Sequence, residues 1–224
     1  MTQGLPTPKA VIFDCDGVVM DSEPISFAML SEQLALYGKP MSHGQMRALF
    51  LGGTIRSFWE GARAMGAALP DDWVEAHYQR MFDRLALGTP LVTGILNVLD
   101  ALEAAGLPCA IGSNGPLRKM EIMFAQHPGL WQRFGGRVFS SQTLGAPKPA
   151  PDVYLYGARA MGVAPQDCVV IEDSVSGLRA ANSAGMRCFG FAADDDGAAL
   201  AREGATVFHA MADLPGLLGI VPVV

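Results

Sequence analysis

Short runs of apolar residues, each bounded by turn-forming residues, recur along the chain and predict buried strands. The runs are continuously apolar rather than alternating, which indicates strands that are covered on both faces, as in a parallel sheet between two helical layers. The predicted strands are Ala10 to Phe13, Cys109 to Ile111, Val138 to Phe139, Cys168 to Ile171, Cys188 to Phe191 and, more weakly, Thr206 to Phe208.

Apolar residues at helical spacing lie between these strands. They predict helices from Ile95 to Leu102, from Pro151 to Gly162 and from Ser176 to Ala184. Strand and helix alternate from about residue 90 to the end of the chain. This order is typical of an α/β fold with a doubly wound, mainly parallel sheet.

The segment from residue 21 to 88 breaks this alternation. It carries four helical patterns, over residues 25–37, 44–50, 54–65 and 72–87, and no strand pattern. We therefore predict a small helical domain, residues 21–88, inserted into an α/β core made of residues 1–20 and 89–224. Trp59 and Trp73 are expected to pack in the small core of that domain.

Composition narrows the classes of partner. Half of the 224 residues are hydrophobic and the formal net charge is −6, so we expect no nucleic-acid partner and no anionic membrane. No apolar run approaches the ~20 residues of a spanning helix, and the first residues show no signal pattern. We expect a cytoplasmic protein, a monomer or a small homo-oligomer, that acts on a small molecule.

Polar residues gather where the predicted strands end. In an open parallel sheet, ligands bind beyond the carboxyl ends of the strands. Three strands end in polar residues, and a lysine between two prolines follows a fourth. The side chains that we expect to converge at this edge are Asp14, Asp16, Ser113, Asn114, Lys148, Glu172 and Asp173.

Each of these residues also has a simpler interpretation. An aspartate after a strand often caps a helix or forms a turn, and most lysines lie on the surface. However, four carboxylates at one edge would repel one another and raise one another's pKa. A hard divalent cation removes that conflict, and carboxylates are ligands that Mg²⁺ prefers. The pattern therefore predicts a metal site, with Lys148 held in place by Pro147 and Pro149.

Four short motifs in the chain resemble the motifs of a known family. Asp14 to Glu23 closely resembles the D-x-D-G-[VT]-x-x-D-[ST] signature of the haloacid dehalogenase-like superfamily. Three later motifs match in order over nearly the whole chain: Ser113-Asn114, Lys148 to Asp152, and Glu172 to Ser174 with Gly177. The helical segment resembles the small cap of the β-phosphoglucomutase-like branch. Ser113 to Pro116, followed by Lys119-Met120, is similar to bacterial 6-phosphogluconate phosphatases.

The resemblance implies a Mg²⁺-dependent phosphatase that hydrolyses a small phosphomonoester through an aspartyl-phosphate. The expected substrate is a sugar or sugar-acid phosphate such as 6-phosphogluconate. Asp14 would be the nucleophile and Asp16 the acid and base, with Ser113, Asn114 and Lys148 binding the transferred phosphoryl group. The implied metal set is Asp14, Asp16 through its backbone carbonyl, Glu172 and Asp173.

Specificity is expected to lie in the cap, which would close over the core from hinges near residues 19–22 and 88–94. Candidate contacts for the polar end of the substrate are Glu23, His43, Arg47, Arg56 and Lys119, and for each a solvated surface side chain is the simpler interpretation.

Three other activities share parts of this pattern. A dehalogenase needs neither Asp16 nor a metal, so the acidic groups oppose it. A sugar-phosphate mutase of the resembling branch carries a cap histidine where this chain has Ser26, which favours hydrolysis. A signalling receiver domain uses similar strand-end residues, but is about half as long and has no helical insert.

Overall fold

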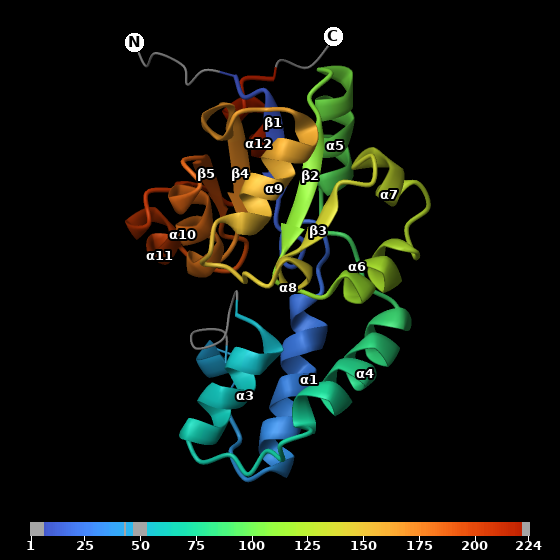
Figure 1. Cartoon of the computed structure of the whole chain (residues 1–224), viewed down its shortest axis with the longest axis vertical. Coiled ribbons are helices and arrows are strands. Elements are labelled where there is room, and N and C mark those ends of the chain that lie inside the picture. The colour runs from blue at the N-terminus through green and yellow to red at the C-terminus, as the bar shows by residue number, and fades with distance from the viewer. Residues whose placement is uncertain (1–6, 43, 47–52, 221–224) are drawn as a thin grey trace.

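A single parallel sheet forms the centre of the molecule (Figure 1). The computed structural model describes residues 7–42, 44–46 and 53–220, and within these ranges six strands pair in the order β3-β2-β1-β4-β5-β6. The strands are β1 (Ala10–Phe13), β2 (Cys109–Ser113), β3 (Val138–Ser140), β4 (Cys168–Glu172), β5 (Arg187–Phe191) and β6 (Thr206–Phe208). The doubly wound α/β fold predicted from the sequence is confirmed, and each predicted strand is present.

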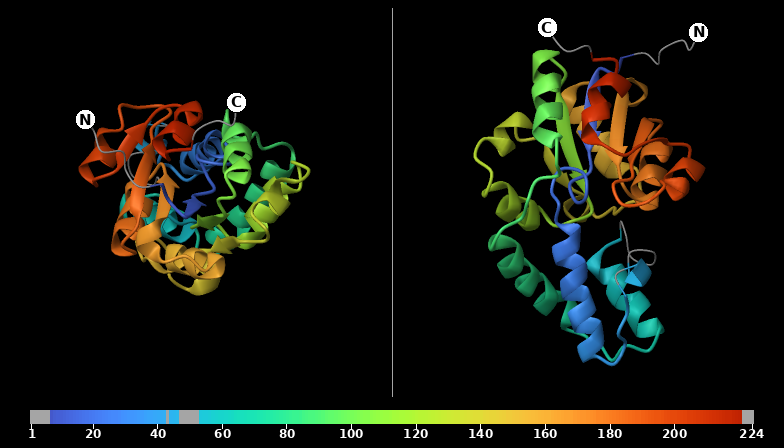
Figure 2. Two further views of the ribbon diagram at one scale, coloured as in Figure 1. Left: turned by 90° about the horizontal axis from the view of Figure 1, so that it is seen from above. Right: turned by 180° about the vertical axis from the view of Figure 1, so that it is seen from behind.

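Helices cover both faces of this sheet (Figure 2). Successive residues of a strand point to opposite faces, so Val11 and Phe13 of β1 pack on one helical layer while Ala10 and Ile12 pack on the other. The first layer contains α5 (Ile95–Ala104), α6 (Leu117–Phe124), α7 (Leu130–Arg133) and α12 (Leu214–Leu217). The second contains α9 (Asp152–Met161), α10 (Val175–Ser183) and α11 (Ala198–Arg202).

Several short elements were not predicted from the sequence. The helices α6, α7 and α12, the helix α8 (Ser141–Leu144), and the 3₁₀ turns over Pro165–Asp167 and Met211–Asp213 span one or two turns at most. A segment of that length does not repeat the 3.6-residue period often enough to be recognised. Within the described ranges, no helix combines the length and the apolarity needed to cross a membrane.

Three helices lie together beyond the carboxyl ends of the strands (Figure 1). They are α1 (Glu23–Leu36), α3 (Ile55–Ala64) and α4 (Trp73–Ala86), and we call residues 23–86 the helical insert. The insert has a small core of its own, in which Phe58 and Trp73 are buried and Trp59 is partly buried, as predicted. The helix predicted over residues 44–50 is helical at residues 44–46, and its remainder lies outside the described residues.

The chain enters and leaves the insert at neighbouring points. The backbone N–H of Asp21 donates to the carbonyl of Pro90 at 2.9 Å, and that of Val92 donates to the carbonyl of Val19 at 3.0 Å. The two connecting segments therefore run side by side. The domain boundaries at residues 21 and 88, and the hinge function of these segments, remain predictions.

His77 provides a test of stability within the insert. Its ring stacks on Trp73 with a centroid distance of 4.6 Å, and its Nδ1 has no hydrogen-bond partner among the described residues. Burial lowers the pKa of His77 to about 4. The unfolded chain takes up a proton near the usual histidine pKa of ~6.5, whereas the folded chain does so only near 4, so folding stability is lost as the pH falls between these values.

We expect acidification from pH 7.5 to pH 5 to destabilise the wild type by about 2 kcal/mol more than the His77→Phe variant. Phenylalanine keeps a ring against Trp73 and cannot be protonated. Urea unfolding of both proteins at the two pH values measures this difference. Parallel loss of stability in the two proteins would show that His77 has no part in the acid response.

Candidate active site

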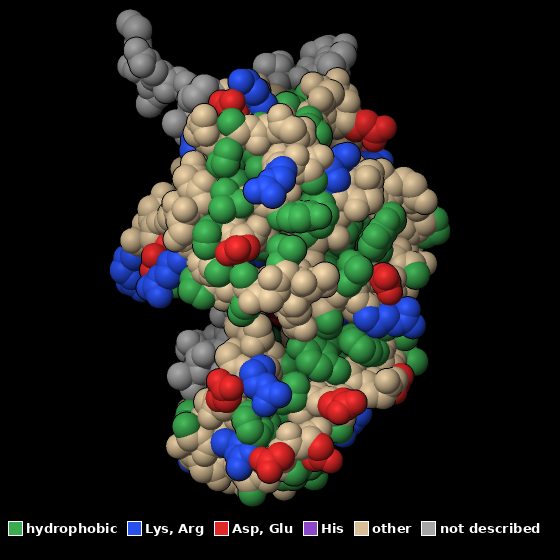
Figure 3. Space-filling view, in the orientation of Figure 1, with side chains coloured by type: hydrophobic (Ala, Val, Ile, Leu, Met, Phe, Trp, Pro, Cys, Tyr) green, Lys and Arg blue, Asp and Glu red, His purple; other side chains and the backbone are tan. Residues whose placement is uncertain are grey.

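The seven strand-end side chains predicted to converge all line one cavity of about 130 Å³. This cavity lies between the carboxyl edge of the sheet and the helical insert, where the space-filling view shows the molecule hollowed (Figure 3). The insert contributes Phe27 and Leu30 of α1 and Tyr78 and Met81 of α4 to its wall. The insert thus adds large apolar side chains to the wall, alongside the polar Glu23, Ser26 and Thr54.

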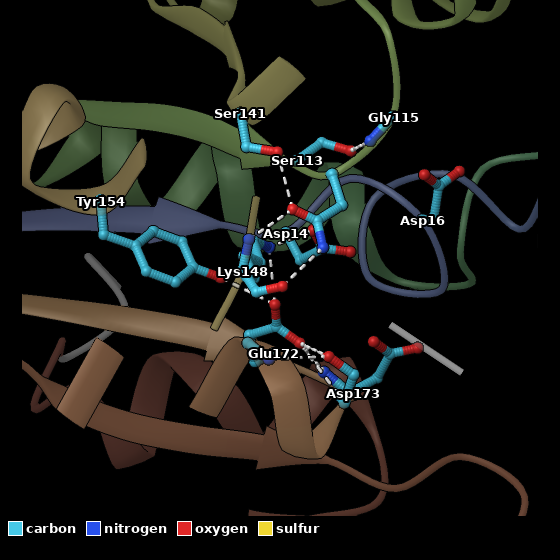
Figure 4. Close-up of polar contacts among 12 residues, drawn as sticks. Asp14, Asp16, Ser113, Gly115, Ser141, Lys148, Tyr154, Glu172 and Asp173 are labelled. Atoms are coloured by element: carbon cyan, nitrogen blue, oxygen red, sulfur yellow. Dashed lines mark hydrogen bonds and ion pairs between the residues drawn. The ribbon is translucent and has the colours of Figure 1, made fainter. Parts of the chain in front are cut away.

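Lys148 lies at the centre of the strand-end side chains (Figure 4). Its Nζ is 2.6 Å from Oδ1 of Asp14 and 2.7 Å from Oε1 of Glu172, and it also lies 4.7 Å from the centre of the Tyr154 ring. The side chain is only 2% exposed. Burial alone would lower the pKa of the Lys148 ammonium, but the carboxylates of Asp14 and Glu172 raise it above its ordinary value. The group is therefore a permanent positive charge joining two strand ends.

Glu172, at the end of β4, is fully buried and receives five hydrogen bonds. Lys148 and the Tyr154 hydroxyl donate to its Oε1, and two backbone N–H groups and the Ser174 hydroxyl donate to its Oε2. Lys148 is the largest of the influences that hold the pKa of Glu172 below its usual value against the effect of burial. Glu172 is thus an ionised anchor for Lys148, with both oxygens already engaged.

Two glycines of the sequence motifs make room for these carboxylates. A Cβ added at Gly177 would lie 1.6 Å from Oε1 of Glu172. Gly17 has φ +76, and a Cβ there would lie 2.1 Å from Oδ2 of Asp173. The backbone after β1 and the first turn of α10 therefore approach the acidic groups more closely than any residue with a side chain would allow.

The carboxylates of Asp14, Glu172 and Asp173 form the group best suited to a metal. One oxygen of each lies within 4.8 Å of the others, and all three residues are buried. Carboxylate oxygens at this spacing suit a hard divalent cation. Because the oxygens of Glu172 already accept five hydrogen bonds, Asp14 and Asp173 are the carboxylates best placed to bind such an ion directly.

The carboxylate of Asp16 lies apart from this group. The sequence motifs imply a metal role for the backbone carbonyl of Asp16 and not for its side chain. Asp16 Oδ1 is 2.6 Å from Nζ of Lys119 and accepts a hydrogen bond from the hydroxyl of Ser22. In Figure 4 its side chain lies to one side of the Asp14 and Lys148 cluster. Burial would raise the pKa of Asp16, but Lys119 and Ser22 bring it below its ordinary value. Asp14 and Asp16 are thus two neighbouring carboxylates in different environments.

Charge in the cavity is unbalanced. Asp14, Asp16, Glu23, Glu172 and Asp173 supply five carboxylates against the two ammonium groups of Lys119 and Lys148, which leaves three negative charges when all the groups are ionised. Burial raises the pKa of Asp14 to about 7, with Lys148 acting in the opposite direction and Glu172 reinforcing the rise. The residues therefore fit a divalent cation, whose charge would offset this excess.

Ser113 and Asn114, at the end of β2, are both buried. The Ser113 hydroxyl accepts a hydrogen bond from the backbone N–H of Gly115 at 2.9 Å. Oδ1 of Asn114 accepts from the backbone N–H of Lys148 at 2.8 Å and from the Ser141 hydroxyl at 2.7 Å. The Asn114 side chain therefore fixes the backbone that carries Lys148.

The residues predicted to set specificity have different surroundings. Glu23 lines the cavity beside Gly17. Arg56 is exposed on α3, with its guanidinium 5.2 Å from the centre of the Trp59 ring, and it is not among the described residues that line the cavity. His43 and Arg47 lie outside the described residues. Lys119 is buried in the cavity wall, so its interpretation as a solvated lysine is wrong.

Several supporting residues were not predicted from the sequence. Tyr154, which donates to Glu172, and Ser141, which donates to Asn114, match no motif. Gln142 donates to the Tyr78 hydroxyl at 2.9 Å and so joins the insert to the core beside the cavity. Ser141 and Gln142 could have been found from their position in the chain, because they directly follow a strand that ends at the same edge of the sheet.

Comparison with known proteins agrees with the motifs. A family model for haloacid dehalogenase-like hydrolases matches residues 8–185. The chain is 32% identical over 181 residues to a phosphoglycolate phosphatase of Xylella fastidiosa, which covers 80% of this chain and 78% of the relative. It is 26% identical over 221 residues to the 6-phosphogluconate phosphatase of Escherichia coli, with 93% and 94% covered. A hydrolase of this family from Deinococcus radiodurans, crystallised with bound phosphate and sodium, aligns with a TM-score of 0.78 at 30% identity over 97% of this chain and 99% of that one.

Proposed function

This chain belongs to the haloacid dehalogenase-like hydrolase family and is a phosphoric monoester hydrolase, and we propose that it cleaves a small phosphate ester at Asp14 with the help of Mg²⁺. The observation that carries this proposal is the contrast between two nearby aspartates. Asp14 contacts Lys148 and belongs to the group of carboxylates suited to a metal, whereas Asp16 contacts Lys119 and Ser22. This contrast supports our assignment of Asp14 as the nucleophile and Asp16 as the acid and base.

In the first step an oxygen of Asp14 attacks phosphorus and the bond to the ester oxygen breaks, which gives an aspartyl-phosphate. Lys148 binds Oδ1 of Asp14, so the second oxygen is the one available for attack. Asp16 must enter this step protonated, although Lys119 and Ser22 favour its ionised form in the free protein, and it donates that proton to the departing alkoxide. Asp16 then takes a proton from a water molecule, which attacks phosphorus and releases inorganic phosphate and the Asp14 carboxylate.

The remaining core residues hold and position these groups. Lys148 and the Ser113 hydroxyl lie on the cavity wall, where they can donate to the phosphoryl oxygens. Asn114 acts by holding the backbone of Lys148. Glu172 and Tyr154 act through Lys148, because both contact its ammonium group and hold it in position.

Asp14, Asp173 and the backbone carbonyl of Asp16 would hold Mg²⁺, with Glu172 supporting them through Lys148. A bound divalent ion supplies positive charge that offsets the carboxylates and polarises a phosphoryl oxygen. The excess of negative charge in the cavity supports this proposal, because a phosphate dianion would otherwise be repelled.

We propose hydrolysis in preference to transfer of phosphate within a sugar. Ser26, in the position where a histidine marks the resembling mutases, lines the cavity. A serine hydroxyl cannot serve as the acid and base that imidazole provides near neutral pH. A dehalogenase would need neither Asp16 nor the carboxylates suited to a metal, so their presence opposes dehalogenation.

The helical insert would act as a cap that shields the reaction from water and selects the leaving group. Its residues line one side of the cavity, and the Tyr78 to Gln142 contact joins it to the core. Candidate substrates are phosphates of small sugars and sugar acids, 6-phosphogluconate among them, which matches the activity named for one relative.

The proposal is tested by phosphate release from a panel of sugar, sugar-acid and short-chain phosphates. We expect turnover with Mg²⁺, loss of at least 100-fold after treatment with a chelator, and recovery when Mg²⁺ is restored. Calorimetry should detect Mg²⁺ binding to the wild type and not to the Asp173→Asn variant. Full activity in excess chelator would refute the metal site. Formation of a phosphate isomer without phosphate release would refute hydrolysis.

A further inference from the structure

Lys119 is a buried lysine that the proposed reaction leaves without a role. It lies on α6 with its side chain 9% exposed, and its Nζ is 2.6 Å from Oδ1 of Asp16. It also lines the cavity between the core and the insert. Burying an ammonium group is unfavourable unless it is paired, so its presence at this point of the wall needs a reason.

The backbone next to Lys119 is shaped to admit it. A Cβ at Gly115 would lie 3.3 Å from Cδ of Lys119 and 3.3 Å from the Ser113 hydroxyl, so a larger residue would crowd both. The neighbouring Met120 and Met123 of α6 pack in the main core, whereas Lys119 faces the cavity. A structural ion pair alone explains this poorly, because Asp16 already accepts a hydrogen bond from Ser22 and apolar residues often replace buried pairs without loss of stability.

This side of the cavity has hydrogen-bonding capacity that the protein does not use. An ammonium group has three N–H donors. Within the described part of the chain, the Lys119 ammonium has one acceptor, Oδ1 of Asp16. Ser26, one helical turn after Ser22, also lines the cavity, and its buried hydroxyl has no partner among the described residues. The unused donors point to a polar ligand.

The position of Lys119 indicates which part of the ligand it meets, and this step rests on the proposed function. Asp16 must contact the ester oxygen in order to protonate it, and Lys119 lies one hydrogen bond from Asp16. Lys148 lies with Asp14, on the phosphoryl side of the site. The first carbons of the leaving alcohol therefore lie beside Lys119 and Ser26.

We propose that Lys119 binds a carboxylate that the leaving alcohol carries two or three bonds from the ester oxygen. The preferred substrates are then phosphate esters of short hydroxy acids. A carboxylate at the far end of a six-carbon chain would lie beyond the reach of Lys119 while Asp16 contacts the ester oxygen.

Matched pairs of esters test this assignment. In each pair the acid and the neutral member differ in one group: 2-phosphoglycolate against 2-hydroxyethyl phosphate, and 3-phosphoglycerate against glycerol 3-phosphate. We expect the wild type to prefer the acid by at least tenfold in kcat/KM. In Lys119→Met the acid should lose ten- to a hundredfold more than the neutral ester, mainly through KM, because a charge-assisted hydrogen bond is lost. Lys119→Arg should keep part of the preference.

Arg118 offers a control on the same helix. Its side chain is 68% exposed and pairs with Glu121, so Arg118→Met removes one positive charge without touching the cavity and should leave the preference unchanged. If Lys119→Met does not fold, Lys119→Gln replaces it. Equal losses on both members of a pair would overturn the proposal and leave Lys119 as a positioning residue for Asp16. Hydrolysis without preference for the acid in the wild type would also overturn it, whereas no hydrolysis of any ester would refute the proposed function first.

Discussion

Replacing Asp14 by asparagine is expected to lower phosphate release by roughly 10⁴-fold or more, because an amide oxygen cannot act as the nucleophile. The change is nearly isosteric, so the cavity should keep its shape. Residual turnover from positioning alone would remain far below that of the wild type. Release of inorganic phosphate under single-turnover conditions, with Mg²⁺ present, measures the effect.

Stability provides the control for this variant. Burial raises the pKa of Asp14 to about 7, which means that the metal-free fold disfavours the ionised carboxylate. The unfolded chain ionises near the ordinary aspartate pKa, so above that value the ionised group contributes unfavourably to folding. In a chelator at pH 7.5 the Asp14→Asn variant should therefore be at least as stable as the wild type. Wild-type turnover by the variant would contradict the assignment of Asp14, and a collapse in stability would trace the loss of activity to the fold.

Much of the site could be predicted from the sequence, because its main residues lie in motifs that follow predicted strands. The four motifs place Asp14, Glu172 and Asp173 at strand ends and Lys148 in the loop that follows β3 and α8. The parallel sheet brings strand ends to one edge whatever their separation along the chain. Asp14 and Lys148, 134 positions apart, meet at 2.6 Å for this reason. The strands themselves could be predicted because their apolar patterns are strong where both faces of the sheet are buried.

The features of the site that the sequence could not predict depend on the direction of individual side chains. Lys119 stands in a two-turn helix where no clear period shows which face is buried, and a lysine is expected at the surface by default. Arg56 shows the opposite case, because the apolar face of α3 buries Phe58 and Ala62 and leaves Arg56 exposed. The anchoring of Glu172 by Tyr154 is invisible in the sequence because it crosses from α9 to β4.

Replacing Lys148 by methionine is expected to affect both activity and stability. Methionine has a similar length and no charge, so Asp14 and Glu172 would be left buried without the cation that lies 2.6 and 2.7 Å from them. Removing one partner of a buried pair typically destabilises a protein by about 3–5 kcal/mol. The pKa of Asp14 would rise further, since Lys148 is what lowers it, and a protonated Asp14 is a poor nucleophile. We expect at least a 10³-fold loss of kcat/KM.

Lys9 supplies a matched control for this prediction. It forms an ion pair of 2.9 Å with Asp167, but its side chain is 69% exposed. Lys9→Met should therefore cost less than about 1 kcal/mol and leave phosphate release unchanged. Urea unfolding of both variants separates the loss of a buried pair from the loss of a lysine as such.

A double variant and a change of pH identify the cause of the instability. Glu172→Gln in the Lys148→Met background removes one of the two uncompensated charges and should recover part of the lost stability, but no activity. The carboxylates without their cation have raised pKa values, so they take up protons at a higher pH in the folded variant than in the unfolded chain, and protonation removes the penalty. The stability difference between Lys148→Met and the wild type should accordingly shrink from pH 7.5 to pH 5. A difference that stays constant with pH, together with no recovery in the double variant, would mean that Lys148 stabilises the fold by packing and not by charge.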